Sequence, residues 1–166
     1  MPRILIIILL FSLGFAACKS SQTTDFRKIY LVRHAEKMKD VDNPSLSPEG
    51  VTRAQSLNKV LKEVQIDAIY STDYNRTQET AAPTADRLGL TIKSYDPRQL
   101  EQFASSIRTE LDGNLLIVGH SNTTPTLVNH LIGEDKYPQL DENQYGDLYI
   151  VTMSSDPEAA VEVKQF

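Results

Sequence analysis

The chain contains the sequence KIYLVRHAE at residues 28–36. Its first six residues are mostly apolar and predict a buried strand that ends on Arg33, with His34 directly after it. Outward from this strand the chain alternates short apolar runs with longer segments of helical periodicity. The clearest helix is expected over 47–62, with Ser47 as its N-cap.

The rest of the chain continues this alternation. Further strands are predicted over 66–71, 90–95, 115–118, 148–153 and 160–164, and further helices over 75–88, from Pro97 to before Gly113, and over 124–132. Pro83 inside the second helix predicts a kink or a restart there. Alternating strands and helices imply an α/β fold: one domain built as a three-layer α/β/α sandwich with a mostly parallel central sheet.

In such a sheet, functional residues lie at the carboxyl ends of the strands. Arg33 and His34 end the first strand, Arg76 follows the second, Asp96 ends the third and His120 ends the fourth. The planar fork of arginine suits phosphate, a neutral imidazole can act as a nucleophile, and a protonated second histidine can stabilise a phosphoryl group in transfer. The residues predict a phosphoryl-transfer pocket that needs no metal and no other cofactor.

These residues also lie in motifs that resemble those of the histidine phosphatase superfamily, which includes the cofactor-dependent phosphoglycerate mutases. The motifs are LVRHAE at 31–36, LSPEG at 46–50 with RA at 53–54, STDYNRTQETA at 71–81 and GHS at 119–121. The resemblance implies a phosphoglycerate mutase-like fold and a phosphohistidine formed on His34. It further implies that Arg33, Arg76, His120 and Ser121 bind the phosphoryl group.

The sequence departs from the family pattern in three places. Ala35 replaces the usual glycine, and Asp40 stands where mutase-like members often place a phosphate-contacting asparagine. No clear counterpart exists for the glutamate that protonates the leaving group in many members. Asp96 is the first candidate for this acid, with an N-cap before Pro97 as its alternative role. Glu36 is the second candidate, although that position is often structural in the family.

The short connections favour a phosphatase over a mutase. Only 33 residues, 82–114, separate the Arg76 motif from the fourth strand, which leaves little room for a lid. The expected substrates are phosphoesters or phosphohistidine, on a small molecule or a phosphoprotein, with specificity set by segments 36–46 and 134–146. Two alternatives remain: a non-catalytic anion-binding lipoprotein of the same fold, and a metal-dependent hydrolase using His34, His120 and His130.

The N-terminus predicts export. Arg3 precedes an apolar run over 4–15, and Ala16, Ala17 and Cys18 follow. This is the pattern of a signal peptide, and Phe-Ala-Ala-Cys resembles the lipobox of bacterial lipoproteins. The alternative is an ordinary signal peptide cleaved elsewhere, with an inert cysteine.

The predicted organisation is therefore a signal peptide over 1–17, a lipidated N-terminus and tether over 18–26, and the phosphatase domain over 27–166. Lys19 and Ser20 lack the aspartate that signals inner-membrane retention, so an outer-membrane position facing the periplasm is expected. Removal of Arg3 leaves 16 basic and 22 acidic residues from totals of 17 and 22, a net charge of −6. Without a basic patch, nucleic acid is not an expected partner.

Overall fold

The computed structural model describes residues 26–39, 42–154 and 159–166. The expectations that concern Cys18, the segment before it and Asp40 lie outside these residues. The elements in chain order are β1 (Arg27–Arg33), α1 (Pro48–Val60), β2 (Ala68–Ser71), α2 (Asn75–Leu88), β3 (Ile92–Ser94), α3 (Leu100–Thr109), β4 (Leu115–Gly119), α4 (Thr123–Ile132), β5 (Asp147–Met153) and β6 (Ala160–Gln165).

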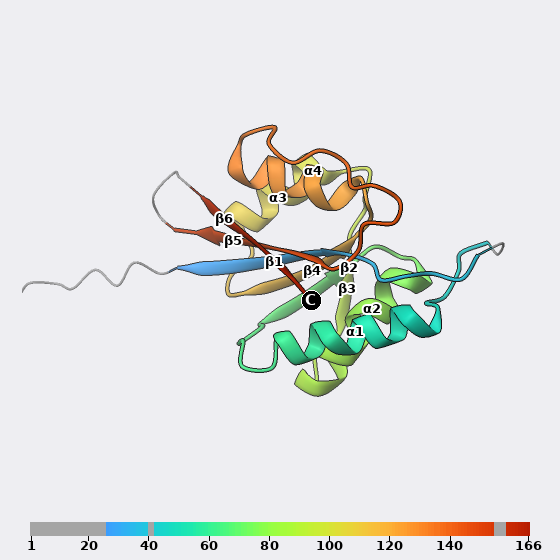
Figure 1. The fold of residues 1–166 in the computed structure, drawn as a ribbon. Helices are drawn as coiled ribbons and strands as arrows, with labels where there is room; N and C mark the ends of the chain where they lie inside the picture. Colours follow the sequence, from blue (N-terminus) through green and yellow to red (C-terminus); the bar gives the residue numbers. More distant parts are fainter. Residues whose placement is uncertain (1–25, 40–41, 155–158) are drawn as a thin grey trace, which may run out of the picture.

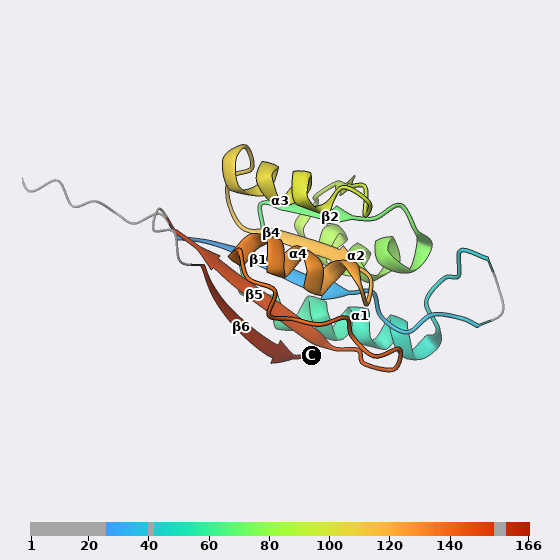
Figure 2. The same cartoon turned by 90° about the horizontal axis from the view of Figure 1, so that it is seen from above.

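Six strands form one sheet in the order β3-β2-β4-β1-β5-β6. The strands β3, β2, β4 and β1 are parallel, whereas β5 and β6 add an antiparallel edge. Helices α1 and α2 cover one face and α3 and α4 the other (Figures 1 and 2). The predicted three-layer α/β/α sandwich with a mostly parallel sheet is confirmed. In the described part of the chain, no helix is both long and apolar enough to span a membrane.

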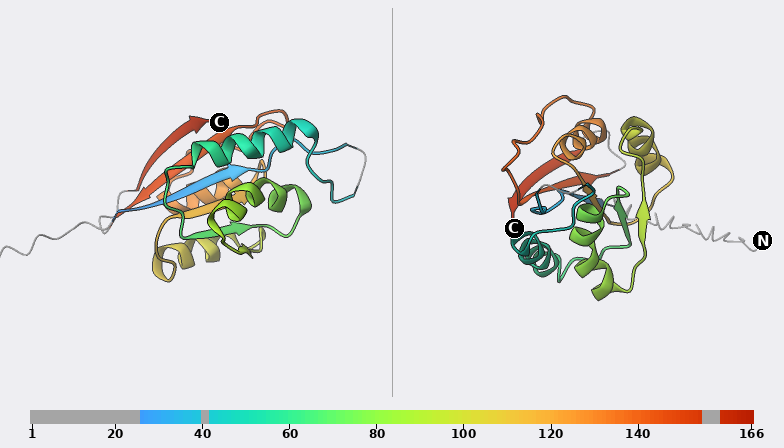
Figure 3. Two further views of the ribbon diagram at one scale, coloured as in Figure 1. Left: turned by 90° about the horizontal axis from the view of Figure 1, so that it is seen from below. Right: turned by 90° about the vertical axis from the view of Figure 1, so that its right-hand side faces the viewer.

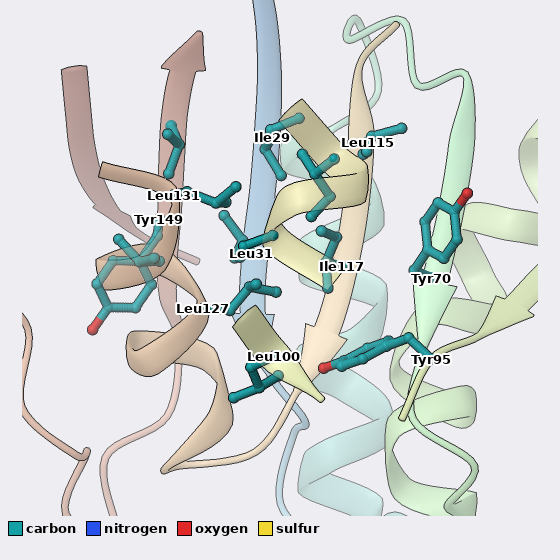
Figure 4. Close-up of a cluster of buried hydrophobic side chains, with 14 of the residues drawn as sticks. Ile29, Leu31, Tyr70, Tyr95, Leu100, Leu115, Ile117, Leu127, Leu131 and Tyr149 are labelled. Atoms are coloured by element: carbon teal, nitrogen blue, oxygen red, sulfur yellow. The ribbon is translucent and has the colours of Figure 1, made fainter. Parts of the chain in front are cut away.

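Both faces of the central strands are buried, because their residues alternate between two cores. Ile29 and Leu31 of β1 pack with Leu127 and Leu131 of α4 on one face, as Figure 4 shows. On the other face Tyr30 and Val32 of β1 pack in a core with Leu57 of α1. The left view of Figure 3 shows α1 and α2 over this face. Continuous apolar strands are the pattern expected for a parallel sheet covered on both sides.

The structure corrects the prediction around residue 96. Strand β3 is three residues long, and α3 begins at Leu100 with Gln99 as its N-cap, so Asp96 does not cap a helix at Pro97. Instead the Asp96 carboxylate accepts a hydrogen bond from the backbone N–H of Arg98, 2.9 Å away. This local bond makes a turn, which competes with helix formation.

A second difference concerns α2. The helix runs without a break from Asn75 to Leu88 with Pro83 inside it, so of the two expected outcomes, a kink or a restart, the restart is absent. Gly89, which follows Leu88, adopts a left-handed conformation with φ of 66° and ends the helix as predicted.

Helix α1 holds the loop that follows His34. Ser47 caps the helix by accepting from the N–H of Gly50 at 3.1 Å, as predicted. Ser47 N–H in turn donates to the carbonyl of Glu36 at 2.9 Å. A side chain at Gly50 would place its Cβ 2.1 Å from that same carbonyl oxygen. The first turn of α1 can therefore approach this loop only because position 50 is glycine.

We predict that Gly50→Ala destabilises the domain by about 2 kcal/mol or more, because the new methyl group must displace a backbone carbonyl. Urea unfolding followed by circular dichroism measures the change. Val51→Ala is the matched control: Val51 is half exposed on the same helix, and its variant should stay within about 0.5 kcal/mol of wild type. Equal stability of Gly50→Ala and wild type would contradict the close approach.

Candidate active site

A cavity of about 370 Å³ opens at the carboxyl ends of β1 and β4. Its lining brings together residues that are far apart in the chain. The lining residues are Arg33, His34, Lys37, Arg76, His120, Ser121, Asn122, Gln139, Leu140 and Glu142. The five residues predicted to carry out catalysis or bind phosphate, apart from the candidate acids, all lie in this set.

Pairing of β1 with β4 brings the two histidines together. Arg33 lies opposite Gly119, and the N–H of His34 extends the pairing by donating to the Gly119 carbonyl at 2.9 Å. The rings of His34 and His120 then lie 5.5 Å apart between centroids. A Cβ at position 119 would come within 3 Å of the hydroxyl oxygens of Tyr95, Thr123 and Thr124, so glycine lets the end of β4 pack closely against Tyr95 and the start of α4.

His34 is held as a neutral imidazole with one free nitrogen. Its Nδ1 lies 2.7 Å from the Ala35 carbonyl oxygen, which can only accept, so Nδ1 carries the proton. Burial lowers the pKa of His34 to about 3, and His120, Arg76 and Arg33 add to the lowering against this hydrogen bond. At neutral pH Nε2 therefore has an unprotonated lone pair, as a nucleophile requires.

His120 is neutral as well. Burial, followed by Arg76 and Arg33, lowers its pKa to about 4. An Arg76 Nη2 lies 3.4 Å from Nδ1 and can only donate, so Nδ1 accepts and the proton is on Nε2. His120 Nε2 donates to the Thr72 hydroxyl at 2.9 Å, and that hydroxyl donates to Thr77 at 3.0 Å. The positive charge that sequence reasoning considered for His120 is absent in the free protein.

The guanidinium of Arg33 has two functions. One amino group, Nη1, donates to the carbonyls of Asp141 and Gln144, both at 2.8 Å. The plane of the group packs on the Tyr145 ring, 4.1 Å from its centroid. Its Nε is buried and has no hydrogen-bond partner among the described residues. Arg33 therefore holds segment 141–145 against the site and keeps one donor free.

Arg76, in the first turn of α2, resembles Arg33 in this respect. Its guanidinium lies over the Tyr74 ring at 4.6 Å, and its Nε is also buried without a described partner. Burial lowers the pKa values of both arginines, and both groups remain charged at neutral pH. Both side chains line the cavity with His34, so their positive charge is available to an anion bound there.

Several site residues were not assigned by sequence reasoning. The ring of Tyr74 meets His120 edge-on at 5.1 Å, and Tyr145 lies 6.2 Å from His34. Lys37, Gln139 and Glu142 line the cavity itself. Segments 36–46 and 134–146 were expected to set specificity, but no periodicity or motif indicated which of their side chains face the site.

Neither predicted acid is placed to protonate a leaving group in this cavity. Asp96 lines a separate hollow beyond Tyr74 and is bound by Arg98, which lowers the pKa of the carboxyl to about 2. Glu36 forms a two-pronged ion pair with Arg53, with Nε at 2.8 and 2.9 Å from its two oxygens. The pKa of Glu36 is lowered: burial raises it, and the bonds to Arg53 outweigh that effect.

His130 lies in α4 and does not line the cavity. Within the described ranges, no three residues among His, Cys, Asp and Glu gather where they could hold a metal ion. The donor set required by the metal-dependent alternative is therefore not assembled around His34 and His120.

Comparison with known proteins agrees with this geometry. Residues 29–98 match the sequence model described as the histidine phosphatase superfamily (branch 1). No curated protein gives a significant match.

Among solved structures, the chain is similar to the protein histidine phosphatase SixA complexed with tungstate, with 16% identity, a TM-score of 0.68, and coverage of 83% of this chain and 96% of that one. It is also similar to the alpha-ribazole phosphatase of Shigella flexneri, at 16% identity, TM-score 0.68, and coverage of 84% and 96%. A mycobacterial glucosyl-3-phosphoglycerate phosphatase matches at 16% identity, TM-score 0.67, and coverage of 86% and 99%. At these identities the structures establish the fold.

The lowered pKa of His34 predicts a stability that falls as the pH is lowered. Below pH 6.5 His34 becomes protonated in the unfolded chain, whereas in the folded protein it stays neutral down to about pH 3. The free energy of unfolding therefore decreases as the pH falls through this window. Between pH 7 and pH 5 we expect His34 to contribute a loss of about 1 to 2 kcal/mol. Urea unfolding at the two pH values, in phosphate-free buffer, measures it.

The comparison with His34→Asn isolates this contribution from the other ionisable groups, because the variant lacks the suppressed protonation site. Its stability should depend less on pH over the same window. An identical pH dependence in the variant and in wild type would show that His34 titrates normally.

Proposed function

Because the chain belongs to the histidine phosphatase superfamily, we propose that it is a phosphatase that hydrolyses phosphate monoesters or phosphohistidine through a phosphohistidine on His34. One observation carries the proposal. The side chains of Arg33 and Arg76 line one cavity with His34, a neutral imidazole whose Nε2 carries the lone pair. Such a cavity attracts an anion through its two guanidinium groups and presents a nucleophile to that anion.

In the first step, His34 Nε2 attacks the phosphorus of the bound ester. The bond from phosphorus to the leaving oxygen breaks, and its electron pair stays on that oxygen, which takes up a proton and departs as an alcohol. Charge on the transferred phosphoryl group is spread over three oxygens. Arg33 and Arg76 line the cavity and supply the positive charge that stabilises it.

In the second step, a water molecule attacks the phosphohistidine. A new phosphorus–oxygen bond forms, the phosphorus–nitrogen bond breaks with its pair returning to Nε2, and the water loses a proton. Inorganic phosphate and neutral His34 result. Asn122, Gln139 and Glu142 line the cavity and are exposed, so water can reach the intermediate. Hydrolysis therefore suits this site better than the enclosed rearrangement that a mutase requires.

The fold alone does not identify the substrate. The similar structures carry the names of a protein histidine phosphatase, an alpha-ribazole phosphatase and a glucosyl-3-phosphoglycerate phosphatase, which are phosphatases of different substrates. We propose a phosphorylated small molecule or a phosphoprotein as the substrate, bound through its phosphate to Arg33, Arg76, His120 and Ser121.

Replacement of His34 by alanine tests the proposal. On p-nitrophenyl phosphate in the presence of EDTA, we predict that wild type is active and that His34→Ala loses about a thousandfold or more in kcat/KM, because the nucleophile is gone. Asn143→Ala is the control, since Asn143 is exposed and does not line the cavity, and it should retain wild-type activity.

Binding of tungstate to the same proteins, measured by calorimetry, separates loss of chemistry from loss of the pocket. His34→Ala should still bind the anion, since both arginines remain. Tungstate binding by a wild-type protein that shows no turnover would instead support the non-catalytic anion-binding lipoprotein. Activity that EDTA abolishes would favour the metal-dependent hydrolase.

We propose further that the protein is an exported lipoprotein, lipidated on Cys18 and held at the outer membrane facing the periplasm. The signal-like segment over 1–17, the Phe-Ala-Ala-Cys sequence and the polar stretch over 19–24 support this. The membrane association would come from acyl chains, because the mature chain carries a net negative charge.

Expression of the full chain in a Gram-negative host supplied with labelled palmitate tests this proposal. We predict that wild type carries the label in the outer-membrane fraction, and that Cys18→Ala carries none because it lacks the acylated thiol. Ser20→Ala, two residues away, should be labelled like wild type. Label in Cys18→Ala, or an unlabelled wild-type protein, would contradict lipidation at this residue.

A further inference from the structure

We propose that Glu142 donates the proton to the leaving oxygen in the first step, which assigns the acid that neither Asp96 nor Glu36 can supply. This inference rests on the proposed phosphatase function. Among the described residues that line the cavity with His34, Glu142 is the one carboxylate. General acid catalysis requires a carboxyl group in the cavity where the ester binds, and Glu142 is such a group.

Hydrogen bonds on both sides of Glu142 fix its backbone. The carbonyls of Asp141 and Gln144 both accept from Arg33 Nη1 at 2.8 Å. Just before them, Leu140 N–H donates to the Ser121 carbonyl at 2.9 Å. The guanidinium of Arg33 thus contacts the segment that carries Glu142, and both residues line the cavity that holds His34.

A second contact anchors the segment to the sheet. The side chain of Gln144 donates to the carboxylate of Asp147 at 2.6 Å, and Gln165 of β6 donates to the other oxygen of the same carboxylate. Asp147 is buried at the start of β5. The edge of the sheet therefore supports the loop at Glu142, although the loop itself is exposed.

The side chain of Glu142 has no hydrogen-bond or ion-pair partner among the described residues. Asp96 and Glu36, by contrast, each bind an arginine and stay ionised. Glu142 interacts electrostatically with Arg33 in the free protein, and a phosphate dianion bound in the same cavity would repel its carboxylate. The charged and titratable groups that share the cavity with it are Arg33, His34, Lys37, Arg76 and His120.

The proton transfers balance over the two steps. As the phosphorus–oxygen bond breaks, the Glu142 carboxyl group gives its proton to the leaving oxygen, which yields an alcohol and a carboxylate. In the second step this carboxylate accepts a proton from the attacking water while the water oxygen bonds to phosphorus. The carboxylic acid is restored as phosphate leaves.

The test compares esters whose leaving groups differ in basicity. A good leaving group needs little protonation, so a missing acid costs most with a poor one. For Glu142→Gln we expect the fold loss in kcat/KM to be about tenfold larger on phenyl phosphate than on p-nitrophenyl phosphate. On glycerol 2-phosphate, kcat/KM of this variant should be about 100-fold below that of wild type. Glu134→Gln is the matched control, because Glu134 is exposed on the same segment but outside the cavity.

If Glu142→Gln lost the same factor in kcat/KM on every ester, Glu142 would have an electrostatic or structural role, and the proposal would be overturned. The phosphatase function itself would still stand, because the wild-type protein would be active. No loss on phenyl phosphate would overturn it too. A wild-type protein that is inactive on p-nitrophenyl phosphate would remove the proposed function, and this inference with it. Tungstate affinity within about twofold of wild type in Glu142→Gln would support a role in the chemical step over one in phosphate binding.

Discussion

The pairing of β1 with β4 at the centre of the sheet is the contact on which the rest of the site depends. It places Arg33 opposite Gly119 and ends with the hydrogen bond from His34 N–H to the Gly119 carbonyl. Because both strands are buried on both faces, their ends cannot shift relative to one another without opening the core. The spacing of the His34 and His120 rings is therefore a property of the sheet, and flexible loops do not set it.

Arg33 connects this rigid centre to the rest of the cavity. Arg33 ends β1, and its side chain therefore lines the cavity in which we propose that phosphate binds. Its hydrogen bonds to the carbonyls of Asp141 and Gln144 hold segment 141–145 in place. The histidines are neutral in the free protein, so the arginines supply the positive charge. A neutral nucleophile beside buried cations is the combination that phosphoryl transfer to an imidazole requires.

Much of this could be predicted from the sequence, because strand alternation and helix caps are local signals. The run KIYLVR, the Ser47 cap and Gly89 set element types, and parallel topology then brings strand ends together. The prediction that Asp96 caps a helix at Pro97 was wrong, because its side chain accepts a hydrogen bond from the Arg98 N–H and forms a turn. The same residue types favour helix caps and turns, so the sequence does not distinguish the two. The segment around Glu142 has no periodicity, and only its long-range bonds to Arg33 bring it to the cavity.

Direct detection of the intermediate tests the central claim most sharply. The protein is mixed with phosphorus-32-labelled substrate, quenched within milliseconds in alkali, digested and analysed for labelled peptides. We predict an acid-labile, alkali-stable label on His34, and none in His34→Ala. Turnover without any label on His34 in the wild-type protein, or label on His120 in its place, would contradict it.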